Sequence, residues 1–437
     1  MIDVERSTMR LVRRRIFSVL FLMFLFNIID RTNVGFAGLQ MNEQLGFTAQ
    51  VFGFGTGLFF VSYLLAELPS NLMLVRFGPR IWLSRICISW GIIATLMAFV
   101  YDTTSFYVLR FLLGLAEAGF TPGLIYYINL WAPKRYHARS IVISALSIPL
   151  SMMLGGPVAG VFLSIDSVGG LAGWRWLFLI EGVPSIVVGL LTLRLLTDRP
   201  QDATWLQPAQ KEWLVREIAN NVAEASHHGI STLADAVRSW RVWRIGIAFF
   251  CVTLTTWGLS FWLPQMVKQL SGLTNTQASM LATLPSVGLT TGFLLNSWHS
   301  DKTQERRWHF AVGALIGAAG LLLSATSSSP SLSFCGLVVT EFGLGCAISV
   351  FFAIPIEILS GTAVAGGLAL INMVGNSAGF FGSYIIGWIR QTTGSFGSSL
   401  LFLSAGMALG ALILMPLNFG SRTRSGVLGE TPKSNEV

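Results

Sequence analysis

Charged residues are scarce in this chain: Asp, Glu, Lys and Arg make up 11% of its 437 residues, whereas 53% are hydrophobic. A soluble domain usually carries about 25% charged residues, so the composition excludes an ordinary soluble enzyme. The hydrophobic residues fall into blocks of roughly 20 residues or more, the length that a helix needs to cross a bilayer. We therefore predict an all-α membrane protein with twelve spans. The expected spans cover residues 16–39, 51–74, 81–100, 105–131, 138–165, 174–196, 242–267, 276–298, 307–327, 331–356, 363–389 and 396–419.

Cysteine and histidine are also few, and neither is spaced for metal binding or disulfide pairing. The four cysteines fall inside expected spans, and the five histidines lie in loops or at span ends. Core packing is the expected role of cysteines in this setting. No imidazole is therefore available at mid-membrane as a proton carrier, and no nucleophile–base pair occurs at depth. We expect no cofactor, no metal ion and no enzymatic activity.

The net charge of +8 is distributed unevenly along the chain. Lys and Arg concentrate in alternate loops, whereas the intervening loops hold only Arg175, Lys268 and Arg390. Because basic loops stay in the cytoplasm, we expect both termini to be cytoplasmic and the protein to lie in a bacterial inner membrane, as a monomer. The charge reflects topology and attraction to anionic lipid, and does not indicate nucleic-acid binding. The basic loops contain Arg6, Arg10, Arg13, Arg14, Arg15, Arg76, Arg80, Arg85, Lys134, Arg135, Arg139, Lys302, Arg306, Arg307, Arg422, Arg424 and Lys433, with further basic residues from Arg194 to Arg244.

One long polar segment divides the chain into two halves of similar organisation. We expect a cytoplasmic segment at 1–15, a six-helix bundle at 16–196, a cytoplasmic linker at 197–241, a second six-helix bundle at 242–419 and a cytoplasmic tail at 420–437. A short basic loop follows the second span of each half. Two parallel six-helix repeats are a transporter architecture in which substrate binds near the middle of the membrane, between the halves.

An acid and a base stand side by side inside the first expected span. Asp30 and Arg31 interrupt an apolar stretch, and each charge at that depth costs about 2.5–3.5 kcal/mol on insertion scales. Asn27 lies one turn earlier, so we expect the three side chains to share one helix face that looks into a protein-lined or water-lined cavity. Ionisable residues within membrane spans usually serve function.

Two further charges are expected at comparable depth in the fourth span. Arg110 lies about five residues into that span, roughly 8 Å below the outer surface, and Glu117 lies two turns deeper on the same face. If the first and fourth spans adjoin, Arg110 can reach Asp30, while Arg31 and Glu117 face the same cavity. The four charges would neutralise one another. A static salt-bridge network that fastens this half is the structural alternative.

Five segments carry the most specific pattern in the chain. They are Asp30-Arg31-Thr32-Asn33-Val34-Gly35-Phe36-Ala37, Glu67-Leu68-Pro69-Ser70-Asn71, Arg110 with Gly114-Leu115-Ala116-Glu117-Ala118-Gly119-Phe120-Thr121-Pro122-Gly123, Gly173-Trp174-Arg175-Trp176-Leu177-Phe178-Leu179-Ile180-Glu181-Gly182-Val183-Pro184, and Asp198-Arg199-Pro200. Together they resemble the anion:cation symporter family of the major facilitator superfamily, from the first span to the twelfth. The resemblance implies the major facilitator fold and the import of small organic anions with protons. Some members transport sugar acids such as galactonate. Others transport tartrate, phthalate or hydroxyphenylacetate.

The resemblance also implies roles for the buried charges. Arg31 would hold the substrate, and Asp30 and Glu117 would carry protons, with Arg110 in the same proton-coupling group. An incoming carboxylate could take Arg31 in a bidentate pair and so withdraw the counter-charge from an acid. That acid would then take up a proton more readily, so substrate and proton would favour each other's binding.

Several polar and aromatic side chains are candidates to contact the rest of the substrate. Tyr63, Asn372 and Asn376 match positions at which the family meets its substrates. Asn372 and Asn376 are four residues apart and share one helix face, and a buried amide without a partner is costly. Trp257 and Trp262 could line the same cavity, although core packing explains a buried tryptophan equally well.

The chain departs from the family pattern at two places. Ile28 stands where many relatives have Tyr, which removes a hydroxyl and favours a less hydroxylated substrate such as an aromatic acid. Val75 precedes Arg76 where the superfamily loop has Asp, whereas the second half keeps Asp301. The contacts of this loop on the inner side would be weaker in the first half, or Glu67 would take the place of the missing Asp.

Other functions and other acids stay open at this level. An anion exchanger, a facilitative uniporter, a sodium-coupled symporter and a membrane sensor without net transport are the alternatives to proton symport. Glu67 and Glu181 lie near span ends, which favours structural roles. Glu341 stands alone in the tenth span, where it would be protonated or would meet a hydroxyl such as that of Thr340.

Overall fold

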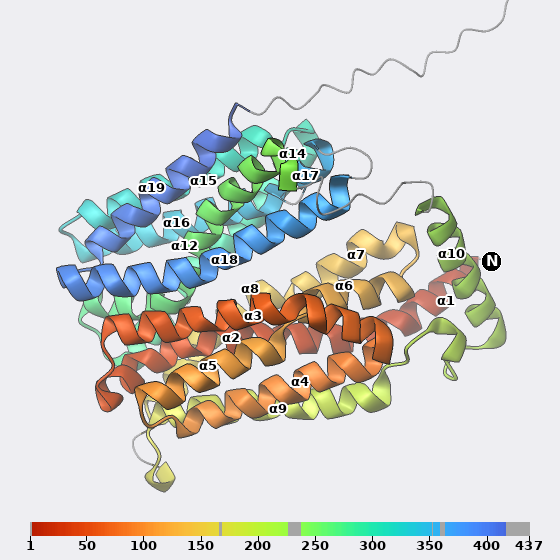
Figure 1. The fold of residues 1–437 in the computed structure, drawn as a ribbon, viewed down its shortest axis with the longest axis horizontal. Helices are drawn as coiled ribbons and strands as arrows, with labels where there is room; N and C mark the ends of the chain where they lie inside the picture. Colours follow the sequence, from red (N-terminus) through yellow and green to blue (C-terminus); the bar gives the residue numbers. More distant parts are fainter. Residues whose placement is uncertain (1, 166–167, 226–236, 352, 359–362, 417–437) are drawn as a thin grey trace, which may run out of the picture.

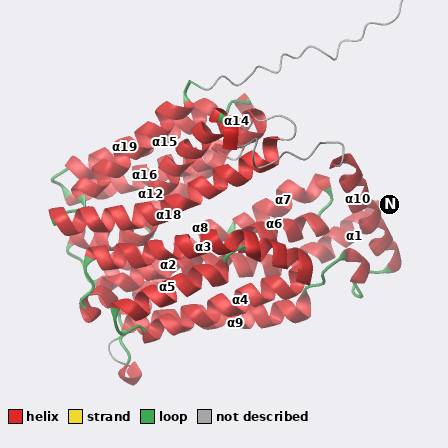
Figure 2. Cartoon of the chain, in the orientation of Figure 1, coloured by secondary structure: helices red, strands yellow, loops and turns green. Residues whose placement is uncertain are grey.

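The computed structural model describes residues 2–165, 168–225, 237–351, 353–358 and 363–416. Figure 2 shows helices joined by short loops, without a strand among these residues. The helices are α1 (Ile2–Val12), the π-helix η1 (Arg13–Phe17), α2 (Ser18–Leu45), α3 (Ala49–Phe77), α4 (Pro79–Leu96), α5 (Thr103–Glu117), α6 (Phe120–Trp131), α7 (Lys134–Ala145), α8 (Ser147–Leu163), α9 (Gly173–Leu195), α10 (Pro208–Ala225), α12 (Trp240–Ser271), α13 (Asn275–Leu281), α14 (Leu284–Thr303), α15 (Arg307–Thr326), α16 (Pro330–Phe351), α17 (Ala353–Ile358), α18 (Ala363–Thr393) and α19 (Gly397–Leu414).

The predicted number of spans agrees with these helices. Nine helical segments of the described chain are long and apolar enough to cross a membrane. The helices α2, α8 and α18 occupy the other three expected positions, and α8 is the short one, with 17 residues. The prediction of an all-α membrane protein with twelve spans is confirmed. The expected tail at 420–437 lies outside the described residues, as does part of the expected linker.

The helices form two bundles that pack side by side (Figure 1). In the first bundle, α2 packs on α8 and α9, and α4 packs between α5 and α9. In the second, α16 packs on α14 and α15, and α19 packs on α15 and α12. The bundles meet through α3 with α18, α2 with α12, and α8 with α13. Both the first and the seventh spans, α2 and α12, therefore take part in the junction between the halves.

Helix backbones of the two bundles approach closely at the end of the molecule opposite α1 and α10 (Figure 1). A Cβ atom at Gly53 would lie 2.6 Å from the carbonyl oxygen of Ser383, and one at Gly387 would lie 2.4 Å from that of Ala49. These residues are at the start of α3 and late in α18. Glycine is needed there because the backbones approach too closely for any side chain. The two bundles are thus closed against each other at that end.

The fourth expected span is broken into two helices. Asp102 begins α5 by accepting a hydrogen bond from the backbone N–H of Ser105 at 2.7 Å, which lowers the pKa of this carboxyl group. The helix ends at Glu117, and Gly119 adopts a left-handed conformation with φ of 82° before α6 starts. A Cβ atom at Gly119 would also lie 2.5 Å from Oγ of Ser70. Glu117 therefore sits at a helix terminus deep inside the bundle, a feature typical of binding sites in transporters.

Close helix packing in the second bundle gives a test of the fold. A Cβ atom at Gly343 would lie 2.3 Å from the backbone nitrogen of Gly317, whereas one at Gly406 would meet only Leu254, at 3.6 Å. Gly343→Ala should therefore destabilise the protein by about 1–3 kcal/mol through overpacking. Gly406→Ala is the matched control and should leave stability unchanged or slightly raise it, because alanine favours helix. Thermal unfolding in detergent measures both, and an unchanged Tm in Gly343→Ala would contradict the packing.

Candidate functional site

The polar residues of the first span lie in the middle of α2, enclosed by other helices. Asn27, Asp30 and Arg31 are buried, and Arg31, the most accessible of the three, is 7% exposed. The helix packs on α8 and α9 of its own bundle and on α12 of the other. Enclosure by protein spares these groups the cost of facing lipid, but each needs a partner from a neighbouring helix.

Arg31 forms an ion pair with Glu117 at the end of α5. Oε2 of Glu117 accepts hydrogen bonds from Nη2 of Arg31 at 2.5 Å, from Nε of Arg31 at 3.0 Å and from Nδ2 of Asn27 at 2.9 Å. Oε1 of Glu117 and Oδ1 of Asn27 have no hydrogen-bond partner among the described residues. The arrangement leaves one oxygen of a buried carboxylate free, while the Arg31 guanidinium also interacts with Tyr63.

Asp30 points away from this ion pair, into the first bundle. Its Oδ2 accepts hydrogen bonds from Nε1 of Trp90 on α4, at 3.0 Å, and from Oγ of Ser185 on α9. The expectation that Arg110 reaches Asp30 is wrong, and so is the single face shared by Asn27, Asp30 and Arg31. Successive helical residues project about 100° apart, so Asp30 turns toward α4 and α9 while Arg31 turns toward α5.

Arg110 lies on α5 between the two bundles. Its Nη2 donates a hydrogen bond to the carbonyl oxygen of Thr56 on α3, at 3.3 Å. Its guanidinium lies 5.1 Å from the ring centre of Phe59 and 5.8 Å from that of Phe261, which belongs to α12. Carbonyl and aromatic contacts of this kind can hold a buried cation without a carboxylate.

Three aromatic rings surround the Arg31 guanidinium, and we call them the aromatic collar. The guanidinium carbon lies 5.0 Å from the ring centre of Phe59, 5.3 Å from that of Tyr63 and 5.6 Å from that of Trp257. Phe59 and Tyr63 belong to α3, and Trp257 belongs to α12 in the second bundle. The ion pair and its collar therefore sit where the two halves of the molecule meet.

Asn372 and Asn376 lie on α18, and the structure does not bring them into the collar. Both are partly exposed, and neither side chain hydrogen-bonds to another described residue. The same helix packs through Gly379 against Phe60, whose ring centre lies 4.9 Å from that of Trp257. Trp262, the other tryptophan of α12, is fully buried and donates from Nε1 to the carbonyl oxygen of Ser383, which is a packing role.

The remaining membrane-embedded acids divide into three environments. Glu67 lies one turn after Tyr63 on α3, is partly exposed and interacts electrostatically with Arg31. Glu181 on α9 is buried and interacts with Asp30, with its Oε2 unpartnered among the described residues. Glu341 on α16 is 9% exposed, and the hydroxyl of Thr340 donates to the carbonyl oxygen of Gly336. Thr340 therefore does not donate to Glu341, and the other alternative, a protonated Glu341, stays a prediction.

Sequence reasoning missed the neutral residues that position the charges. Trp90 and Ser185 hold Asp30, and Phe59 and Phe261 pack on the arginines. A tryptophan or phenylalanine in an apolar span gives no signal of its own, because packing explains it equally well. Ser185 follows directly after one of the motif segments, which was the only available hint.

The described residues offer the site no evident metal-binding group. Across the described ranges, no three His, Cys, Asp or Glu side chains come together in a group that could hold a metal ion. Its carboxylates and guanidinium groups can form ion pairs and hydrogen bonds, and the carboxylates can bind protons.

Comparison with known proteins identifies the family. Residues 20–383 match the Major Facilitator Superfamily. The chain belongs to this superfamily. An Agrobacterium vitis protein named "Putative tartrate transporter" is 41% identical over 419 residues, covering 95% of this chain and 96% of that protein. A quinolone resistance transporter of Acinetobacter baumannii is 37% identical and covers 94% and 95%. The first of these relatives confirms the resemblance to organic-acid transporters within the superfamily.

A solved structure agrees with the fold. The xylose transporter XylE from E. coli, in a partially occluded inward-open conformation, has a TM-score of 0.74 at 17% identity. The match covers 95% of this chain and 99% of XylE. At this identity it supports the fold alone. The chain is an integral membrane protein of a transporter family, and the two bundles are those of the major facilitator fold.

The buried ion pair predicts a large stability effect. Arg31→Met should destabilise the protein by about 3–5 kcal/mol, because it leaves the Glu117 carboxylate buried without its counter-charge. Adding Glu117→Gln should recover a large part of the loss. Apparent Tm in detergent measures the series. Arg135→Met is the control: its ion pair with Glu5 is half-exposed, so it should cost about 1 kcal/mol or less. Equal losses of stability from Arg31→Met and Arg135→Met would show that the buried ion pair stabilises the protein no more than the exposed one does.

Proposed function

We propose that this protein imports a small organic anion together with protons across the bacterial inner membrane by alternating access. The observation that carries the proposal is the Arg31–Glu117 ion pair, buried at the junction of the two bundles and surrounded by the aromatic collar. The family and the relative named for tartrate support an organic-acid substrate. Anion exchange or facilitated uniport of the same substrates is the alternative.

Substrate binding would begin at Arg31. A carboxylate can compete with Glu117 for the guanidinium, because the planar fork suits two parallel hydrogen bonds. Trp257 and Tyr63 would then pack on the rest of the molecule. Since Trp257 comes from the second bundle, a bound substrate would touch both halves at once. Binding could therefore bias how the bundles pack, which is what transport between two states requires.

Proton coupling would follow from the same exchange of partners. While Arg31 holds Glu117, the carboxylate is stabilised in its charged form. When a substrate draws the guanidinium away, the buried carboxylate loses its counter-charge and protonation at its free Oε1 becomes favourable. Substrate and proton would thus promote each other's binding, and this reciprocity is thermodynamically required of a coupled carrier.

Asp30 would serve as a second proton carrier in this scheme. Its Oδ1 is unpartnered within the described part of the chain, and it lies beside Arg31 in sequence. Any rotation or shift of α2 that moves Arg31 also moves Asp30 relative to Trp90 and Ser185. Arg110, held by the Thr56 carbonyl oxygen, would supply positive potential to this group of acids without occupying either of them.

The composition of the site narrows the substrate class. The collar is aromatic, and Ile28 adds no hydroxyl, so a flat or aromatic carboxylate would pack well on Trp257. Asn372 and Asn376 would reach the hydroxyl groups of a sugar acid or a dicarboxylate once the bundles close around it. The relative named for quinolone resistance supports a substrate range that extends beyond small hydroxy acids.

Because basic loops stay in the cytoplasm, the α1 end of the molecule would be cytoplasmic. The bundles are closed at the opposite end, around Gly53 and Gly387. This arrangement would make the described state inward-facing. The N-terminal bundle (16–196) and the C-terminal bundle (242–419), joined by the linker at 197–241, would then be the two bodies that rock about the ion pair.

Replacing the glutamate separates proton coupling from substrate movement. Glu117→Gln should abolish uphill uptake driven by a proton gradient while leaving substrate counterflow, because the amide cannot exchange a proton. Uptake and counterflow in proteoliposomes measure the two activities with the same labelled substrate. Glu43→Gln, on the exposed face of the same helix as Arg31, is the control and should keep both. Persistent uphill accumulation in Glu117→Gln would remove this residue from the coupling mechanism.

Replacing the arginine by lysine tests substrate binding. Arg31→Lys keeps the charge but loses the bidentate fork, so affinity should fall by about tenfold or more. Thermal-shift titration with organic acids measures affinity, because a ligand stabilises the state that it binds. Arg216→Lys, an exposed residue of α10, should bind as the unmodified protein does. Unchanged affinity in Arg31→Lys would place the substrate elsewhere.

A further inference from the structure

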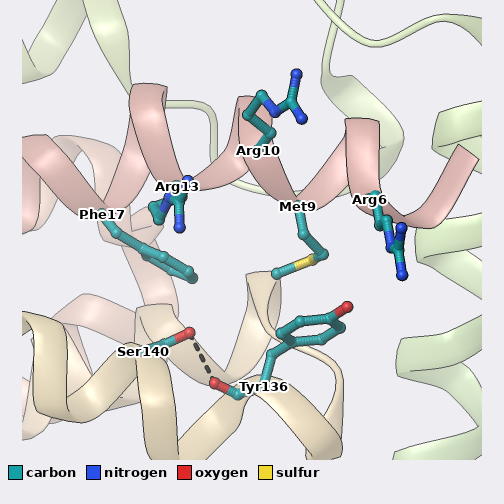
Figure 3. Close-up of a pocket in the computed structure, with 7 residues that line it drawn as sticks. All are labelled: Arg6, Met9, Arg10, Arg13, Phe17, Tyr136 and Ser140. Carbon is teal, nitrogen blue, oxygen red and sulfur yellow. Dashed lines mark hydrogen bonds between the residues drawn. The ribbon is translucent and has the colours of Figure 1, made fainter. Parts of the chain in front are cut away.

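A second anion site is indicated far from the ion pair, in a cavity between α1 and α7. The cavity has a volume of about 320 Å³. Its lining combines three arginines with apolar and hydroxyl side chains. The lining residues are Arg6, Met9, Arg10, Arg13, Phe17, Tyr136 and Ser140 (Figure 3). We call it the arginine pocket. None of these residues belongs to the transport mechanism proposed above.

The arginine pocket has a charged part and an apolar part. Figure 3 shows Met9, Phe17 and the ring of Tyr136 between the two helices, with Arg13 beside Phe17 and Arg6 at the Tyr136 end. Met9 and Phe17 are buried and form an apolar floor. Arg10 lies on the outer side of α1 in the same view. The pocket therefore offers positive charge at its rim and hydrocarbon inside.

The arginines of the pocket are available for a ligand. Arg6, Arg10 and Arg13 form no ion pair with a carboxylate among the described residues, although Glu5 is close by in the sequence. Glu5 is already engaged, since its carboxylate accepts from Tyr136 Oη at 2.6 Å and pairs with Arg135 at 2.9 Å. Glu5 is thus taken by other partners, and the arginines of the rim pair with no carboxylate that the structure describes.

Neighbouring contacts hold the pocket in shape. The other side of α1 packs on α10, where Nε2 of Gln210 donates to Oγ of Ser7 at 3.0 Å. The hydroxyl of Ser140 donates to the carbonyl oxygen of Tyr136 at 2.9 Å (Figure 3). The pocket also includes the start of a π-helix, Arg13–Phe17, and such segments are frequent at functional sites.

We infer that the arginine pocket binds the phosphate-bearing head group of an anionic membrane phospholipid. The side chains of Arg6 and Arg13 are long enough to converge on one phosphate, although their α-carbons are about 10 Å apart along the helix. The glycerol and the first part of an acyl chain would lie against Met9 and Phe17. A soluble phosphate would use the arginines alone and gain nothing from that apolar floor.

The site lies at the level where such a lipid is found. The helices α1, η1 and α2 follow one another without a gap from Ile2 to Leu45, so the pocket is at the entry of the first membrane span. Basic groups near an anionic leaflet gain about 1 kcal/mol each, and basic pockets between spans bind anionic head groups. Because the same run of helix carries Arg31, a lipid held here would steady the segment that bears the candidate transport site.

Matched double substitutions test the pocket against general surface charge. Nanodiscs of phosphatidylcholine, with and without phosphatidylglycerol, supply the lipid, and native mass spectrometry after mild release counts the lipid retained. Arg6→Gln with Arg13→Gln should weaken retention of phosphatidylglycerol about thirtyfold. Arg14→Gln with Arg216→Gln removes the same charge from exposed residues outside the pocket and should retain the lipid. Equal losses from the two pairs, or none from either, would overturn the proposal.

Two further experiments complete the test. One distinguishes a lipid phosphate from a soluble phosphate, and the other uses a variant that keeps the charge, to control for misfolding. Glycerol phosphate, added to protein in phosphatidylcholine nanodiscs, should not raise the Tm as phosphatidylglycerol does; an equal shift would make the pocket a soluble-phosphate site and overturn the lipid assignment. Arg6→Lys with Arg13→Lys keeps the charge and should keep most of the retention. If this pair loses the lipid while it folds with an unchanged Tm, charge at the pocket is not what binds it, and the proposal fails.

Discussion

The ion pair between Arg31 and Glu117 is the interaction on which the interior of this protein depends. It joins α2 to α5 where water is scarce, and a charge left alone there would cost several kcal/mol. Asn27 and the aromatic collar complete its surroundings, and Trp257 brings in the second bundle. The pair is incompletely satisfied, since one carboxylate oxygen of Glu117 has no partner among the described residues. An ion pair of this kind can stabilise one conformational state, and a substrate carboxylate can still replace Glu117 as the partner of Arg31.

The backbone near the ion pair has two features: α5 ends at Glu117, and glycines let the two bundles approach closely. The regular helix ends at Glu117, and Gly119 turns the chain two residues later, so the carboxylate projects from a terminus instead of a continuous helical surface. At the junction of the bundles, Gly53 and Gly387 let helix backbones meet with no side chain between them. Such contacts depend on shape and are lost over short distances. The bundles can therefore pack firmly at one end without being bonded along their whole length.

The two anion sites, one proposed for substrate and one for lipid, lie on one uninterrupted run of helix. Arg31 is in the middle of α2, and Arg6 and Arg13 are in α1 and η1, which lead into it. The two arginine environments differ in what accompanies the charge. Arg31 is buried with a carboxylate and aromatic rings, whereas the arginine pocket has exposed cations over an apolar floor. The first suits exchange of partners, and the second suits an amphipathic ligand that stays.

The fold and the identity of the charged residues were readable from sequence because they depend on local composition. Apolar blocks long enough to span a bilayer predict the helices, and a charge inside such a block stands out by its cost. The partners of Asp30 and Arg31 could not be predicted from the sequence. Asp30 and Arg31 are neighbours in the chain, but helical geometry turns one toward Trp90 and Ser185 and the other toward Glu117. Which charge meets which partner depends on how α2 is rotated against α4, α5 and α9, and only tertiary packing decides that rotation.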